Sequence, residues 1–218
     1  MRHSMIDQTK LRHLLRLYLV LDPDLCGGPE GMIRTAEAAA CAGVTAVQLR
    51  APHWKKRMYA ECGRELLKAL APHDVPLIVN DHADVAVAIG AHGLHVGQSD
   101  LSPEDCRRLM PSGMILGLSI SNMDECRRID PNLVDYIGIG PYKDTATKKD
   151  AAAATGLAGL ADIARASVCP SVAIGGIKAA DVPTVMQTGV DGIAVVSAIC
   201  GQPDVHRAVN ALLNVMPS

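Results

Sequence analysis

The sequence predicts a (β/α)8 TIM barrel, formed by the whole chain as a single domain. Short apolar runs alternate with helical segments eight times, with one pair in roughly every 20–30 residues, and strict alternation implies parallel strands joined by right-handed crossovers. The runs are apolar almost throughout, as expected of strands buried on both faces. An open doubly wound sheet is the alternative, but the turn at residues 22–28 does not fit its usual Gly-rich pattern.

The predicted strands are short runs rich in Val, Ile and Leu that end at Gly, Pro or polar residues. They cover residues 17–21, 44–49, 76–79, 93–96, 114–118, 134–139, 171–174 and 192–196.

The predicted helices lie between these runs. They cover residues 30–42, 54–70, 83–89, 156–166, 180–187 and 203–215, and two more begin near Ser102 and Ser121. Ser102 is a good N-cap because Pro103 and two acidic residues follow it. Residues 1–16 read as a basic, partly amphipathic helix that caps one end of the barrel. The expected division is therefore a helix at 1–16, the barrel core at 17–199 and a last helix at 200–218.

Composition narrows the function classes. A formal net charge of −2 gives no electrostatic reason to expect nucleic acid or an anionic membrane as a partner. No uncharged apolar run reaches the length of about 18 residues that a membrane span needs, and no signal-peptide cleavage site is evident, so a cytoplasmic protein is expected. The seven scattered cysteines read as reduced thiols. A homo-oligomer is left open.

Polar side chains follow the second, third and fourth predicted strands. Gln48 and Arg50 are two residues apart and so share one side of a strand. Their side chains can bind the edge of a heterocycle and a phosphate, respectively. Asn80-Asp81 and Asp100 follow the next two strands, and paired carboxylates without a Cys or His cluster suit Mg²⁺. Because each Asp also precedes a helical segment, a helix N-cap is the alternative interpretation.

Groups that bind anions follow the later strands. The Gly175-Gly176 pair lets the backbone approach a ligand, and the loops after strands seven and eight are the usual phosphate site of this fold. A generic basic loop and simple tight turns are the alternatives. The candidate residues are Ser119, Thr145, Thr147, Lys148, Gly176, Val196 and Ser197.

Together the strand ends form a series of short motifs. They are Gln48-x-Arg50, Asn80-Asp81, Gly97-Gln98-Ser99-Asp100, Thr145-x-Thr147-Lys148, Gly175-Gly176-Ile177 and Val195-Val196-Ser197. In this order and spacing, from about Leu17 to Ile199, the chain resembles the thiamine-phosphate synthase family. The Thr-x-Thr-Lys loop combined with Gly-Gln-x-Asp is fairly specific.

The resemblance implies a transferase that joins hydroxymethylpyrimidine diphosphate to hydroxyethylthiazole phosphate. The products would be thiamine phosphate and diphosphate. In that family diphosphate leaves first, and the thiazole nitrogen traps the pyrimidine-methyl cation. Catalysis of this kind depends on positioning and charge stabilisation, which would explain why no nucleophile–base pair is evident.

The resemblance also implies roles for individual residues. Asp81 and Asp100 would hold Mg²⁺, the expected cofactor, and Arg50, Ser119 and Lys148 would be the catalytic set. The pyrimidine diphosphate would contact Gln48, Arg50, Asn80, Ser119 and Lys148. The thiazole phosphate would contact Thr145, Thr147, Gly176, Val196 and Ser197. Small phosphorylated substrates are thus the expected partners.

Two departures from the family pattern keep other functions open. Pro52 stands where the family usually has a Lys, and the loss of one cation would weaken diphosphate binding by about 1.5–3 kcal/mol. His53, Lys55 and Lys56 are the nearest replacements, and Ser121 replaces a usual His. A thiazole tautomerase-like isomerase on the same barrel and a non-catalytic binder of thiamine precursors are therefore the alternatives.

Overall fold

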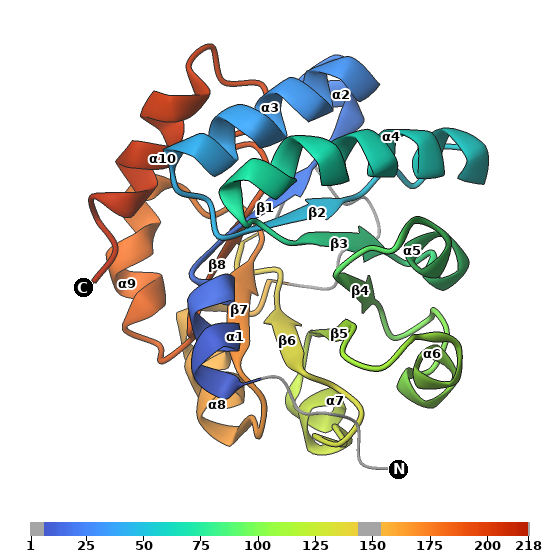
Figure 1. Ribbon diagram of the computed structural model, residues 1–218. Helices are drawn as coiled ribbons and strands as arrows, with labels where there is room; N and C mark the ends of the chain where they lie inside the picture. Colours follow the sequence, from blue (N-terminus) through green and yellow to red (C-terminus); the bar gives the residue numbers. More distant parts are fainter. Residues whose placement is uncertain (1–6, 144–153, 218) are drawn as a thin grey trace.

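A computed structural model, which describes residues 7–143 and 154–217, shows eight parallel strands in a closed barrel (Figure 1). The strands follow one another in sequence order, and β8 pairs with β1 to close the ring. Their bounds are β1 Leu17–Leu21, β2 Ala46–Leu49, β3 Leu77–Asn80, β4 Gly93–Val96, β5 Ile115–Ile120, β6 Tyr136–Ile139, β7 Ser171–Ile174 and β8 Gly192–Val195. The predicted fold is confirmed.

Helices surround the barrel and bury their apolar faces against it (Figure 1). The α-helices are α1 Gln8–Leu15, α2 Pro23–Cys26, α3 Pro29–Ala42, α4 Lys56–Leu70, α5 Ala83–Ile89, α6 Pro103–Leu109, α7 Met123–Arg127, α8 Gly156–Ala166, α9 Val182–Met186 and α10 Val205–Leu213. Two 3₁₀ turns, η1 Ala71–His73 and η2 Ala179–Asp181, complete the described elements. None of the helices in these residues is both long enough and apolar enough to span a bilayer.

Helix α1 lies across the N-terminal end of the barrel. Leu11 and Leu15 are fully buried there, in one cluster with Tyr18 and other inward-facing strand residues. The Arg12 guanidinium pairs with Asp191, the residue directly before β8. Packing and an ion pair therefore hold α1 over the end of the barrel where the strands begin.

Differences between the predicted and observed elements have local causes. Helix α2 is missing from the sequence prediction because four residues are too few for a hydrophobic period, although Asp22 caps it and Gly27 ends it with φ 74°. Strand β5 runs on to Ile120 because Ser119 and Ile120 pair with β6, which places Ser119 inside a strand instead of at its end. The helix predicted at 180–187 is split into η2 and α9.

Candidate active site

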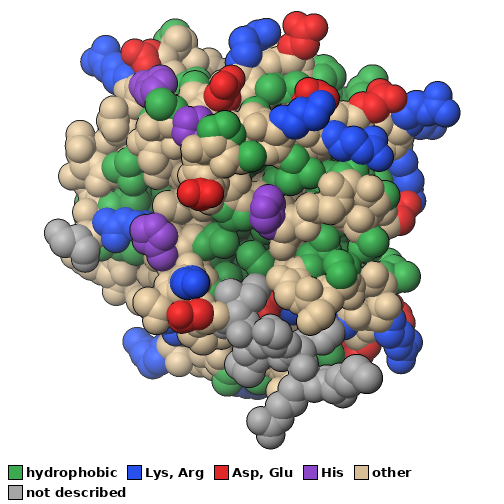
Figure 2. Space-filling view, viewed as in Figure 1, with side chains coloured by type: hydrophobic (Ala, Val, Ile, Leu, Met, Phe, Trp, Pro, Cys, Tyr) green, Lys and Arg blue, Asp and Glu red, His purple; other side chains and the backbone are tan. Residues whose placement is uncertain are grey.

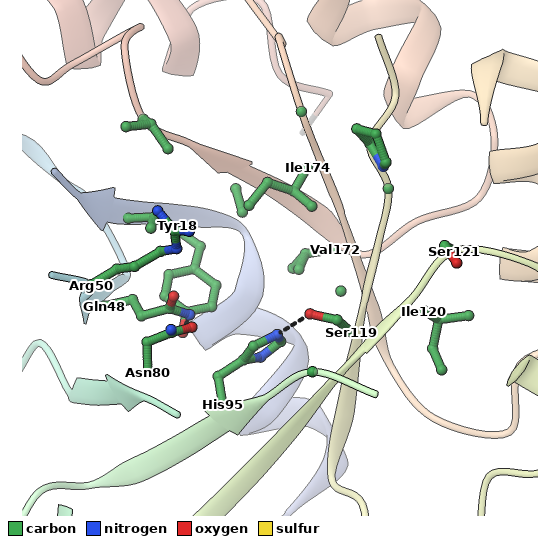
Figure 3. Close-up of a pocket in the computed structure, with 18 of the residues that line it drawn as sticks. Tyr18, Gln48, Arg50, Asn80, His95, Ser119, Ile120, Ser121, Val172 and Ile174 are labelled. Atoms are coloured by element: carbon green, nitrogen blue, oxygen red, sulfur yellow. Dashed lines mark hydrogen bonds between the residues drawn. The ribbon is translucent and has the colours of Figure 1, made fainter. Parts of the chain in front are cut away.

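A cavity of about 640 Å³ opens at the C-terminal ends of the strands. Every strand, or the loop that follows it, contributes to the lining, and Figure 3 shows Gln48, Arg50 and Asn80 projecting into it from neighbouring strands. On the outer face seen in Figure 2, acidic and basic side chains are interspersed and form no patch of one sign. Polar side chains from several strands therefore converge on this cavity.

The structure brings most of the sequence-predicted site residues into this one cavity. Those that line it are Gln48, Arg50, Asn80, Asp81, Asp100, Ser119, Gly176, Val196 and Ser197. Thr145, Thr147 and Lys148 lie outside the described residues. The described residues on either side of that segment meet at the cavity edge, because Thr155 N–H donates to the carbonyl of Pro141, a lining residue, at 2.7 Å.

A continuous chain of hydrogen bonds crosses the barrel, and all of its members except Tyr136 line the cavity. The Gln48 amide donates to the Tyr18 hydroxyl at 2.9 Å, and that hydroxyl lies 3.0 Å from the hydroxyl of Tyr136. Tyr136 is 2.9 Å from His95 Nδ1, and His95 Nε2 is 3.0 Å from Ser119 Oγ (Figure 3). Strands β1, β2, β4, β5 and β6 thus share one polar network.

The direction of this chain follows from burial. Since the Gln48 amide donates to it, the buried Tyr18 hydroxyl needs an acceptor for its own proton, and Tyr136 provides one. If Tyr136 then donates to His95 Nδ1, the His95 ring carries its proton on Nε2 and donates it to Ser119. This arrangement leaves the Ser119 hydroxyl proton for a ligand oxygen.

The two tyrosines act as neutral hydrogen-bonding groups. Burial raises the pKa of Tyr18 and Tyr136 well above the usual value near 10. Sequence reasoning missed both, because a Tyr inside an apolar run reads as a core residue. The available signal was that a hydroxyl buried in a barrel needs a polar partner.

Asp81 and Asp100 are not helix N-caps, which removes the alternative interpretation. His82 is the N-cap of α5 and Ser102 is the N-cap of α6. Asp81 has φ 63°, a left-handed conformation that its N–H bond to the His95 carbonyl at 2.9 Å helps to hold. One oxygen of Asp100 accepts the Gly97 N–H at 2.7 Å.

The donor set fits Mg²⁺ better than a softer metal. In the described part of the chain, no group of three or more His, Cys, Asp and Glu residues is placed to hold a metal ion. Two carboxylates on one cavity are the set that Mg²⁺ uses when substrate phosphates and water complete its shell.

Charge in the cavity is unbalanced. Among the described lining residues the carboxylates are Asp81, Asp100 and Glu125, and Arg50 is the only Lys or Arg. Pro52 lines the cavity, but His53, Lys55 and Lys56 do not, and the Lys56 ammonium binds Asp84 at 2.7 Å. The expected replacement of the family Lys is therefore not found within these residues, and a polyanion needs further cations to bind here.

Glu125 is a lining residue that the sequence did not single out. Its carboxylate accepts the Ser121 N–H at 2.7 Å and also bonds the Ser121 hydroxyl. Ser121, which replaces the usual family His, is thus held by a carboxylate on α7. The signal was weak, since an acid in the first turn of a helix reads as a capping residue.

Glycine and serine residues in the turns after β7 and β8 form a cradle in the cavity lining. Gly175 and Gly176 have φ 108° and 70°, values that favour glycine, and a Cβ on Gly175 would come within 2.7 Å of the Pro141 Cα. Ser197, from the loop after β8, accepts a hydrogen bond from the Lys178 ammonium at 2.9 Å. These groups lie together after β7 and β8, where the sequence predicts a phosphate site, and that role stays a prediction.

Comparisons with known proteins agree along almost the whole chain. Residues 17–199 match the family model described as thiamine monophosphate synthase. The chain is 48% identical over 188 residues to the thiamine-phosphate synthase of Laribacter hongkongensis, covering 86% of this chain and 89% of that one. It is 45% identical over 202 residues to the enzyme of the same name from Azorhizobium caulinodans, covering 93% and 95%.

Structural similarity points the same way. A solved thiamine phosphate pyrophosphorylase from Pyrococcus furiosus superposes with a TM-score of 0.85 at 33% identity, covering 94% of this chain and 96% of that one. The barrel, the cavity motifs and these matches lead to one conclusion: the chain belongs to the thiamine monophosphate synthase family.

Proposed function

We propose that this chain condenses hydroxymethylpyrimidine diphosphate with hydroxyethylthiazole phosphate to give thiamine phosphate and diphosphate. The observation that carries the proposal is a single cavity in a chain of this family. Asp81, Asp100, Arg50 and Ser119 line one part of it, and the Gly176–Ser197 cradle lines another. Two phosphorylated groups can therefore be held in one site, each by its own set of residues.

The reaction needs positioning more than acid–base chemistry. Arg50 offers a bidentate donor to the departing diphosphate, and Ser119 offers the hydroxyl proton that the buried chain leaves available. Because the Gln48 amide nitrogen donates to Tyr18, its amide oxygen is the atom that can accept from the ring amino group. These contacts hold the pyrimidine with its leaving group while the thiazole nitrogen approaches.

We assign Mg²⁺ to Asp81 and Asp100. When bound there, the ion would neutralise charge on the leaving diphosphate. The imbalance of three carboxylates against one guanidinium in the described lining supports this assignment. The Asp100 oxygen bonded to Gly97 N–H is oriented by the backbone, which leaves its other oxygen to face a cation.

The partners, the cellular location and the oligomeric state of the protein also stay proposals. A net charge of −2 gives no electrostatic reason to expect nucleic acid or an anionic membrane, and we propose small phosphorylated substrates as the partners. A cytoplasmic location fits substrates of that kind. A homo-oligomer is compatible with the proposed reaction.

The proposal is tested by incubating the protein with both precursors and Mg²⁺. Thiamine phosphate and diphosphate should appear together in equal amounts, and chelation of Mg²⁺ should stop both.

The absence of a donor at Pro52 favours one alternative, the tautomerase-like isomerase, which needs no diphosphate site. Isomerisation of a thiazole carboxylate phosphate without Mg²⁺, and no condensation, would select it. Tight precursor binding without turnover would select the non-catalytic binder.

A further inference from the structure

Lys178 places a cation beside the glycine–serine cradle. Lys178 is not itself a lining residue, but its ammonium donates at 2.9 Å to Ser197 Oγ, which does line the cavity. In sequence Lys178 follows Gly176 by two residues, so one short segment presents both the backbone N–H groups and the charge. Because Lys178 donates to the Ser197 oxygen, the Ser197 hydroxyl proton is directed elsewhere and can bond a ligand oxygen.

The backbone of Lys178 is fixed by a neighbouring carboxylate. Asp181 Oδ2 accepts the Lys178 N–H at 3.0 Å, and Asp181 Oδ1 accepts the Lys143 ammonium at 2.6 Å. The charge of Asp181 is therefore already balanced by Lys143. Within residues 7–143 and 154–217 the ion pairs do not include Lys178, and its ammonium bonds a neutral hydroxyl.

Electrostatics explain why a cation is needed at this point. A phosphate monoester carries a charge of roughly −1.5 to −2 near neutral pH. The described cavity lining has three carboxylates and one guanidinium, and that guanidinium, Arg50, follows β2 instead of lying beside the cradle. A phosphate placed on Gly176 and Ser197 would therefore meet backbone dipoles, one hydroxyl and the Lys178 ammonium.

We propose that Lys178 binds the phosphate of the thiazole substrate directly and makes the site discriminate against the unphosphorylated thiazole alcohol. The proposal rests on the function proposed above and adds a residue to it. An ammonium has three N–H donors, so it can keep Ser197 and bond a phosphate oxygen at the same time.

The test compares Lys178→Met, Lys178→Arg and the control Lys68→Met. Lys68 pairs with Glu65 on the exposed face of α4, so its change removes the same charge far from the cavity. In Lys178→Met the KM for thiazole phosphate should rise by ~10- to 100-fold, the loss expected for a hydrogen bond to a charged group. The KM for the pyrimidine diphosphate and the KM for the thiazole alcohol should not change. Lys178→Arg should recover most of the loss, and Lys68→Met should behave as the unchanged protein.

Two results would overturn the role of Lys178. One is an unchanged KM for thiazole phosphate in Lys178→Met, and the other is an equal rise for the phosphate and the alcohol. If the unchanged protein makes no thiamine phosphate, the proposed function fails, and calorimetry with thiazole phosphate and with inorganic phosphate then decides on Lys178 alone. Weaker binding of both ligands by Lys178→Met would support it, whereas equal binding, or no binding by either protein, would reject it.

Discussion

At the scale of single residues, the proposed Mg²⁺ site depends on the carboxylates of Asp81 and Asp100. Asp81→Asn and Asp100→Asn each keep the shape of the side chain but remove the charge that the proposed Mg²⁺ would need. Each change should lower kcat/KM by about 100-fold or more, the order found when an electrostatic contact to a transition state is lost. Steady-state kinetics across a range of Mg²⁺ concentrations provide the measurement.

The matched control for this prediction is Asp84→Asn. Asp84 also lies near the end of β3, but it pairs with Lys56 and does not line the cavity. Activity and Mg²⁺ dependence should persist in this variant. Unaltered rates in Asp81→Asn and Asp100→Asn would rule out both as Mg²⁺ ligands.

Tyr136 stands in the middle of the buried hydrogen-bond chain. Tyr136→Phe should destabilise the protein by about 1–3 kcal/mol, because the Tyr18 hydroxyl and His95 Nδ1 both lose a partner. Tyr18→Phe should destabilise the Tyr136→Phe variant less than it destabilises the unchanged protein. The reason is that it removes the Tyr18 hydroxyl that Tyr136→Phe leaves without an acceptor. Urea unfolding of the two single variants and the double variant measures this coupling, and strictly additive losses would contradict a shared network.

The residue scale is also where sequence reasoning was least complete. The motif residues Gln48, Asn80 and Ser119 could be predicted because each lies at or near a strand end that the barrel brings to one face. The hydrogen-bond chain that links Gln48 to Ser119 could not, because Tyr18, His95 and Tyr136 come from three strands and meet only through the closed sheet. The contact of Lys178 with Ser197 was hidden for the same reason, since nineteen positions separate the two residues.

At the scale of elements, steric contact as well as the backbone dihedral angles restrict Gly175, in the turn after β7, to glycine. Gly175→Ala adds a Cβ within 2.7 Å of Pro141 Cα, at φ 108°. Gly189→Ala has a similar φ of 93° but meets no atom within 4 Å, so it isolates the backbone strain. Gly175→Ala should therefore lose more stability than Gly189→Ala and should raise the KM for thiazole phosphate. Thermal unfolding and kinetics check the two effects, and equal losses would show that the contact with Pro141 can relax.

Element boundaries were predictable where a glycine or a polar residue interrupts an apolar run. The predicted bounds of α5, α8, β4 and β7 agree with the structure, and Gly90, which ends α5, has φ 68°. Boundaries were wrong where pairing decided them, as at β5, whose last residues are held by β6. Propensity cannot show this, because the partner strand is remote in sequence.

At the scale of the whole molecule, the two ends of the barrel have separate roles. Leu15 on α1 is fully buried at the end opposite the cavity. Leu15→Ala should lower the free energy of unfolding by about 2–5 kcal/mol, while the KM values for the pyrimidine diphosphate and the thiazole phosphate stay unchanged. Chemical denaturation and kinetics test this, with Leu109→Ala, an exposed site, as the neutral control. A change in KM would show that α1 communicates with the cavity.

The buried tyrosines should also lower the stability of the folded protein at alkaline pH. Burial raises the pKa of Tyr18, Tyr59 and Tyr136 in the folded state, whereas in the unfolded chain these groups ionise near pH 10. The unfolded state therefore releases protons that the folded state retains, so the free energy of unfolding should fall as pH rises above about 10. Denaturation between pH 8 and 11 measures the slope, which should be shallower in a Tyr18→Phe, Tyr136→Phe double variant. An equal slope in both proteins would exclude these tyrosines as its source.

The bond from Thr155 N–H to the Pro141 carbonyl, together with that from Gly156 N–H to the Tyr142 carbonyl, joins the two sides of residues 144–153. The chain leaves and re-enters the barrel at one fixed point. Insertions or deletions between these anchors therefore need not shift the register of β7 or the start of α8. The strands and helices that carry the described cavity lining can therefore keep their places when the number of residues between Tyr142 and Thr155 changes.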